Sequence, residues 1–171
     1  MGHRKRHRCR AAGLVGALLA GSALLACSPT PARFDVTPYA GNYAGQWSHR
    51  PSGTSGPVRI GVRPAEKVAA ATVTVDLGGD PLGAGDPPAV EVTALLDGEV
   101  ATVTARSPIL GRVDLEVQPD GSITGTNAEL LRGLGGAFTC AGRMTAASVS
   151  VSCTGSDDPT TVFEVRADRE A

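Results

Sequence analysis

Apolar and polar residues alternate with a period of two over several segments of this chain. Val58, Ile60 and Val62 alternate with arginine and glycine, and the same pattern returns at 72–77 and 112–117. A period of two indicates β-strands that have one face buried and the other in water. Strands of this kind must cover their apolar faces with one another, so the pattern predicts an all-β fold.

Short turn signals separate these strands. Asp97-Gly98 is typical of a type I′ hairpin, and Pro119-Asp120-Gly121 predicts a tight turn that brings Val117 near Ile123. Centring the first hairpin on its turn places Val90, Val92 and Ala94 across from Ala105, Val103 and Ala101, and Thr93 across from Thr102. A slip of one residue would turn the apolar set outward, so pattern and turn together predict this register.

We expect eight to ten short strands in an antiparallel meander, the last of them at 161–167. The edges of such a meander must be hidden. A closed or partly closed barrel hides them, and a two-sheet β-sandwich is the alternative. Residues 78–88 are expected to form a surface loop. Residues 127–133 are expected to form one helical turn, with Asn127 capping it and Gly133 ending it.

Two of the four cysteines, Cys140 and Cys153, fall within this β-domain. If their segments pair as strands around the intervening turn, Cys140 faces Cys153 and Met144 faces Val149. Cross-strand neighbours have the Cβ separation that a disulfide needs, and a bridge here would stabilise the fold by roughly 3 kcal/mol. We therefore predict a disulfide. A redox or metal-binding pair is the alternative, although the chain has no CxxC motif.

The N-terminus carries five basic residues between Arg4 and Arg10, followed by a 15-residue apolar stretch at 11–25. This stretch is too short for a permanent bilayer span, so residues 1–26 are expected to be a signal peptide. Its end, Leu24-Leu25-Ala26-Cys27, resembles the lipobox of bacterial lipoproteins, in which the cysteine receives a diacylglyceryl group before cleavage. A transmembrane anchor, or a plain signal with a chance cysteine, is the alternative.

The lipobox resemblance implies three parts: the signal peptide 1–26, an acylated N-terminus and tether at 27–33, and a single β-barrel-like domain at 34–171. Lipidation at Cys27 would add acyl chains, and two such chains hold a protein durably on a membrane. The resemblance therefore implies a lipid-anchored protein on the extracytoplasmic face of the cell membrane. Its membrane contact would be the anchor at Cys27.

Charge argues against a nucleic-acid partner. The chain has 16 Lys and Arg residues against 17 Asp and Glu residues, and five of the basic ones belong to the signal peptide. The remaining domain is therefore acidic, whereas nucleic-acid binding needs a basic surface.

The β-domain begins with the run Phe34-Asp35-Val36-Thr37-Pro38-Tyr39-Ala40-Gly41-Asn42-Tyr43, and Gly45-Gln46-Trp47 follows it. This segment is similar to the opening of lipocalins and their relatives in the calycin group. Either Tyr43 or Trp47 fills the position of the family's tryptophan. The resemblance implies a barrel closed by a contact between that aromatic ring and an arginine near the last strand, here Arg166. It also implies an internal site for a small apolar molecule. The alternative is that both aromatics are core residues of an unrelated β-domain.

Catalysis has little support. His49 is the one histidine after the signal peptide, and it is expected to be a solvated turn residue rather than a base. The acidic pairs Asp157-Asp158 and Asp114 with Glu116 are expected to be solvated as well. No phosphate-binding loop and no set of metal ligands is present in the sequence. We therefore expect a non-catalytic protein without a cofactor.

Two functions remain. The interior candidates are mostly Val, Ala, Leu and Gly, and small linings leave room for a ligand, so the first expectation is a binding protein for a lipid or other apolar small molecule. The alternative is an envelope protein-interaction module or an inhibitor of a secreted hydrolase, whose protein partner the sequence does not name. Leu130, Leu131 and Leu134 could form an apolar lip at the barrel mouth, or anchor a connection onto the core.

Overall fold

The computed structural model describes residues 34–66, 69–81, 85–107, 111–127 and 137–171, which belong to one compact unit of the chain. The expected signal peptide, Cys27, the tether, the helical turn after Asn127 and the three leucines of the apolar lip lie outside the described residues. Within these residues, no helix is long and apolar enough to cross a bilayer.

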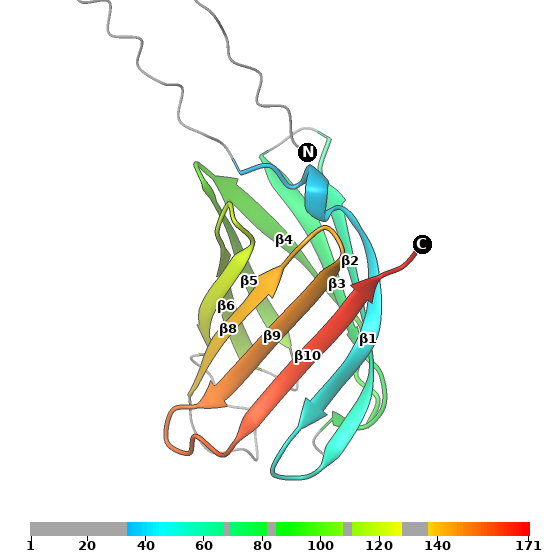
Figure 1. Cartoon of the computed structure of the whole chain (residues 1–171), viewed down its shortest axis with the longest axis vertical. Helices are drawn as coiled ribbons and strands as arrows, with labels where there is room; N and C mark the ends of the chain where they lie inside the picture. Colours follow the sequence, from blue (N-terminus) through cyan, green and yellow to red (C-terminus); the bar gives the residue numbers. More distant parts are fainter. Residues whose placement is uncertain (1–33, 67–68, 82–84, 108–110, 128–136) are drawn as a thin grey trace, which may run out of the picture. The chain divides into compact units, whose positions relative to one another are not determined.

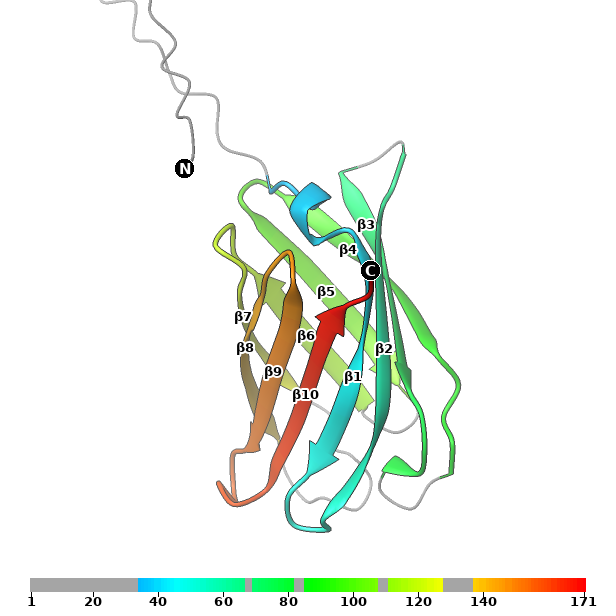
Figure 2. The same cartoon turned by 45° about the vertical axis from the view of Figure 1, so that its right-hand side comes forward.

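Ten antiparallel strands follow one another in a meander and close into a barrel (Figures 1 and 2). A 3₁₀-helical turn, η1 (Thr37–Tyr39), precedes them. The strands are β1 (Gly41–His49), β2 (Thr54–Pro64), β3 (Ala70–Leu77), β4 (Val90–Asp97), β5 (Val100–Ser107), β6 (Gly111–Val117), β7 (Ser122–Asn127), β8 (Phe138–Met144), β9 (Ser148–Gly155) and β10 (Val162–Arg169). The predicted all-β meander and barrel are confirmed. Because β10 pairs with β1, the sheet is continuous, and the sandwich alternative is wrong.

The period of two in the sequence decides which side chains enter the barrel. On β2, Val58, Ile60 and Val62 are buried, whereas Arg59 and Arg63 between them are exposed. Each strand therefore turns one row of apolar side chains inward and leaves the alternate row in water. The core of the domain is the interior of the barrel.

Residues 34–40, which we call the N-terminal strap, lie across the end of the barrel where β1 begins (Figure 2). The Phe34 N–H donates to the Gly98 carbonyl, 2.7 Å away, in the β4–β5 turn. The Tyr39 hydroxyl donates to the Pro119 carbonyl, 3.3 Å away, before β7. The Arg169 guanidinium, at the end of β10, donates to the Ala40 carbonyl. The strap is thus fastened to three places around this end, which we call the strap end. The end where β1 finishes at His49 is the far end.

The predicted register of the β4–β5 hairpin is wrong by two residues. Ala101 pairs with Leu96 instead of Ala94, and Thr102 pairs with Leu95 instead of Thr93. The turn has Gly98 and Glu99 as its central residues, because Gly98 takes a φ of 58° and Asp97 already pairs with Val100. A shift of two keeps every side chain on its predicted face, so alternation alone could not detect the error.

The β8–β9 and β6–β7 hairpins follow the predicted registers. Cys140 pairs with Cys153, and the two form a disulfide with an S–S distance of 2.08 Å. Val117 pairs with Ile123 on the β6–β7 ladder. The disulfide lies on the inner face of the barrel, where Cys140 is buried.

Candidate ligand-binding cavity

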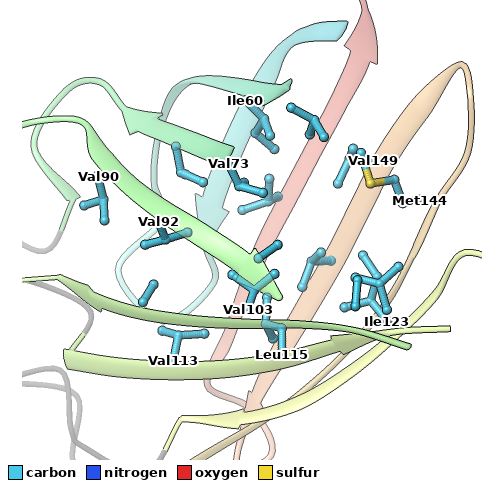
Figure 3. Close-up of a pocket in the computed structure, with 18 of the residues that line it drawn as sticks. Ile60, Val73, Val90, Val92, Val103, Val113, Leu115, Ile123, Met144 and Val149 are labelled. Carbon is cyan, nitrogen blue, oxygen red and sulfur yellow. The ribbon is translucent and has the colours of Figure 1, made fainter. Parts of the chain in front are cut away.

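The barrel encloses a cavity of about 250 Å³ with a predominantly apolar lining. Figure 3 shows Val73, Val92, Val103 and Leu115 converging on this space from four neighbouring strands. The lining residues are Phe34, Val36, Tyr39, Ile60, Val62, Ala71, Val73, Val75, Leu77, Pro87, Pro88, Val90, Val92, Ala94, Leu96, Ala101, Val103, Ala105, Val113, Leu115, Val117, Ile123, Phe138, Cys140, Met144, Val149, Val151, Cys153, Phe163 and Val165. No charged residue is among them. The space therefore suits a hydrocarbon ligand.

One side of the interior, formed by β1, β2 and β10, is filled by large side chains. Trp47 of β1 is 1% exposed and stacks on Phe163 of β10, with ring centroids 5.8 Å apart. Its indole N–H donates to the Gly78 carbonyl over 2.9 Å. Tyr43, also on the inner face of β1, is fully buried. Its hydroxyl donates a hydrogen bond to the Tyr39 carbonyl over 2.8 Å. This burial raises the pKa of Tyr43. We call this region the packed side.

The opposite side, formed by β3, β4, β5 and β6, carries only small side chains inward. Val73, Val92, Val103, Val113 and Leu115 all line the cavity and remain half-buried, since each borders the cavity. We call this region the hollow side. The cavity thus exists because one half of the barrel wall supplies bulky rings and the other half does not.

The strap closes one end of the cavity. Phe34 and Tyr39 stack with ring centroids 5.7 Å apart, and both are buried. They form an apolar cluster with Ala101, against which Leu96 and Met144 pack. Phe34 and Tyr39 also line the cavity, so the strap covers the cavity at the strap end.

The cavity reaches the surface elsewhere. Pro88, just before β4, is exposed and also lines the cavity, and its neighbour Pro87 is half-buried. The other lining residues are buried or half-buried. The exposed part of the lining therefore lies beside the start of β4, toward the far end of the barrel.

Two of the three predicted closure residues lie inside the barrel and one does not. Tyr43 and Trp47 are both buried on the inner face of β1. Arg166 lies on the outer face, with its side chain 75% exposed and 3.4 Å from a carboxylate oxygen of Glu164. The predicted contact between Arg166 and the aromatic ring is wrong, because the alternation on β10 turns Phe163 inward and Arg166 outward. Only that alternation in the sequence indicated that Phe163 faces inward.

His49 is not the solvated turn residue that the sequence suggested. It is 1% exposed at the end of β1, and its Nδ1 lies 2.7 Å from the Ser52 hydroxyl. Its Nε2 is buried and has no hydrogen-bond partner among the described residues. Burial lowers the pKa of His49. The contact with Ser52 therefore ties the buried His49 ring into the β1–β2 hairpin.

Asp157, Asp158 and Glu116 are exposed, as predicted, whereas Asp114 is half-buried. On the outer face, Asp114 accepts a hydrogen bond from the Thr104 hydroxyl and forms an ion pair with Arg112. These interactions lower the pKa of Asp114. Asp158 is exposed and accepts hydrogen bonds from Thr160 in the β9–β10 turn. The described part of the chain holds no group of three or more His, Cys, Asp or Glu residues placed to hold a metal ion.

Comparison with known proteins adds no family. No protein-family profile matches this chain, and a search of the curated proteins found no significant match.

Proposed function

We propose that this chain is a lipid-anchored extracytoplasmic protein whose barrel binds a lipid or other apolar small molecule without transforming it. The observation that carries the proposal is the cavity of about 250 Å³ with its predominantly apolar lining. Binding sites for small molecules are typically concave and mostly apolar, with volumes from about 300 Å³ upward. At about 250 Å³, this cavity lies just below that range.

Burial of hydrocarbon alone supports useful affinity. Each buried CH₂ group contributes about 0.8 kcal/mol, so about fifteen of them contribute about 12 kcal/mol. Association costs about 4 kcal/mol or more in lost freedom. The difference corresponds to a Kd of about 1 μM. An alkyl chain could therefore bind here without any polar contact inside the barrel.

The anchor supports a role at the membrane surface. Leu24-Leu25-Ala26-Cys27 would fix the domain to the bilayer through acyl chains on Cys27. A barrel held beside the membrane has a source of apolar ligands next to it. The proposed role is to hold or pass such a molecule outside the cytoplasm.

A lipid extraction tests the ligand. We expect the full-length protein, purified after expression in a bacterium, to carry an apolar compound that mass spectrometry detects after solvent extraction. Val92→Phe takes up part of the cavity and should reduce this cargo. Thr93→Phe is the matched control, because Thr93 is exposed on the same strand and points outward. Equal cargo in both variants, or none in the parent protein, would contradict the ligand-binding proposal and favour a protein-interaction module.

A single substitution tests the anchor. Cys27→Ser removes the thiol that lipidation requires, so the variant should leave the membrane fraction while the parent protein stays in it. Cys9→Ser is the control, since Cys9 lies in the predicted signal peptide. Membrane association of Cys27→Ser at the parent level would refute lipidation at this site.

A further inference from the structure

The ladder that pairs β4 with β5 stops short of the far end of the barrel. Their ladder holds four residue pairs, from Ala94 opposite Val103 to Asp97 opposite Val100. Between residues 90–93 and 104–107, all of which the structure describes, no pairing is present. In contrast, β5 pairs with β6 along its whole length, from Ala101 opposite Val117 to Ser107 opposite Gly111. We call the unpaired stretch the slot.

The slot leads into the cavity. Val90 and Val92 on one edge and Ala105 on the other line the cavity. Glu91 and Arg106, which alternate with them, are exposed. The one exposed lining residue among those described, Pro88, directly precedes the same end of β4. The slot therefore lies between the surface and the cavity on the hollow side, whereas the strap covers the strap end.

The two edges of the slot are suited to pairing. Continuing the observed register would place Thr93 opposite Thr104 and Glu91 opposite Arg106. Opposite charges and paired threonines each stabilise neighbouring antiparallel strands. No proline interrupts either edge. The sequence thus permits the strands to pair here, although the observed ladder ends at Ala94 and Val103.

We propose that the cavity takes one unbranched alkyl chain and admits it sideways through the slot, whose edges part and close around it. The inference rests on the proposed ligand-binding function and adds the ligand class and its route. A slender chain passes between two strands where a ring system does not. A volume of about 250 Å³ favours one chain over two. The head group of the ligand stays outside, because the lining offers no charged partner.

A reversible staple across the slot tests the route. Glu91→Cys with Arg106→Cys would join the two edges when oxidised. The control, Leu95→Cys with Thr102→Cys, joins the same strands where they already pair. Both are made in the full chain with Cys9→Ser and Cys27→Ser, which removes competing thiols. Binding is followed through Trp47, the single tryptophan of the chain, whose fluorescence a brominated palmitate should quench because Phe163 links it to the cavity.

We expect the oxidised slot staple to slow the association of brominated palmitate by about tenfold or more, with recovery on reduction. The control staple should leave the rate unchanged. An unchanged rate with a verified slot staple would refute the sideways route. Equal binding of cholesterol or phosphatidylcholine would refute the single-chain ligand.

A second variant covers the case in which the staple does not form. Glu91→Cys alone is labelled with a bulky maleimide, and Leu95→Cys, also exposed on β4, is the matched control. Slowing only by the label at Glu91 supports the route, and equal rates refute it. If the unlabelled parent protein binds no palmitate and yields no extracted cargo, the proposed function fails. If it yields cargo of another class, only the inference on the ligand fails.

Discussion

The packed side and the hollow side of the barrel are built from the same strand pattern but differ in side-chain volume. On the packed side, Trp47 and Phe163 stack and Tyr43 is fully buried. On the hollow side, Val73 and Val103 occupy equivalent inward positions and border the cavity. Alternation decides that a residue faces inward, and its size then decides whether the interior is core or cavity.

The distribution of aromatic residues along the chain explains this difference. All six aromatic residues lie at or before Trp47 or at and after Phe138, so the stretch 48–137 contains none. That stretch includes all of β3, β4, β5 and β6. Close packing needs volume, and aliphatic side chains of this size do not reach across a ten-stranded barrel. A cavity on this side is the expected consequence.

The largest effect should come from emptying the packed side. Trp47→Ala removes the ring that stacks on Phe163 and the hydrogen bond to Gly78, and we expect it to lower the free energy of unfolding by about 3–5 kcal/mol. Trp47→Phe keeps an aromatic ring and loses the hydrogen bond, so its cost should be about 1 kcal/mol. Urea unfolding measures both. Equal costs would show that the ring does not carry the packing.

Enlarging a side chain should destabilise the packed side more than the hollow side. A Cβ on Gly45, in β1, would clash with the Arg166 carbonyl and lie 2.6 Å from the Ala167 Cα. Because backbone must move, Gly45→Ala should cost about 3 kcal/mol. Val92→Phe adds more atoms but extends into the cavity, so its cost should stay below about 1 kcal/mol. A larger cost for Val92→Phe than for Gly45→Ala, measured by thermal unfolding, would mean that the hollow side is not hollow.

A matched pair of valines sharpens the comparison with a smaller change. Val58 on the packed side is 1% exposed, whereas Val103 borders the cavity. Val58→Ala loses its buried methyl groups and leaves a void, so it should cost about 2 kcal/mol. Val103→Ala only enlarges an existing space and should cost about 1 kcal/mol or less. Chemical denaturation of both variants, each stripped of cargo, gives the difference. Identical costs would contradict the distinction.

The sequence predicted the faces of the strands better than their partners. The alternation at Val58, Ile60 and Val62 correctly marked inward residues, because burial selects for it directly. The β4–β5 register failed since a shift of two residues around Gly98 preserves every face. Arg166 failed because the family resemblance supplied a contact that the alternation on β10 forbids.

The candidate site was predictable in its chemistry and not in its shape. The inward candidates of the whole domain, mostly Val, Ala, Leu and Gly, predicted a roomy interior, and the cavity agrees with that expectation. The strap and the slot had no sequence signal. The strap depends on contacts between Phe34 and Gly98, far apart in the chain, and the slot is a place where a permitted pairing does not form. Both arise from how the closed barrel distributes its strands.

The smallest effect should be an acid-side loss of stability from His49, on the packed side. Burial lowers the pKa of His49 below its ordinary 6.5, so the unfolded chain binds this proton at a higher pH than the folded protein does. Stability then falls as the pH falls below about 6.5, and the loss is complete once the pH passes below the folded pKa.

Exposed carboxylates act in a separate range. Hydrogen bonds from Ser122 lower the pKa of Asp120 below 3.8, and those from Thr160 do the same for Asp158, so their contribution is lost only in stronger acid. His49→Gln removes the titrating group and keeps a side chain able to bond to Ser52. We therefore expect the midpoint of urea unfolding to fall between about pH 7.5 and about pH 5 in the parent protein and to change less in this variant. Val103 and its neighbours on the hollow side carry no titrating group inward. If His49→Gln leaves the pH dependence of the unfolding midpoint unchanged, the acid sensitivity belongs to the outer surface rather than to the packed side.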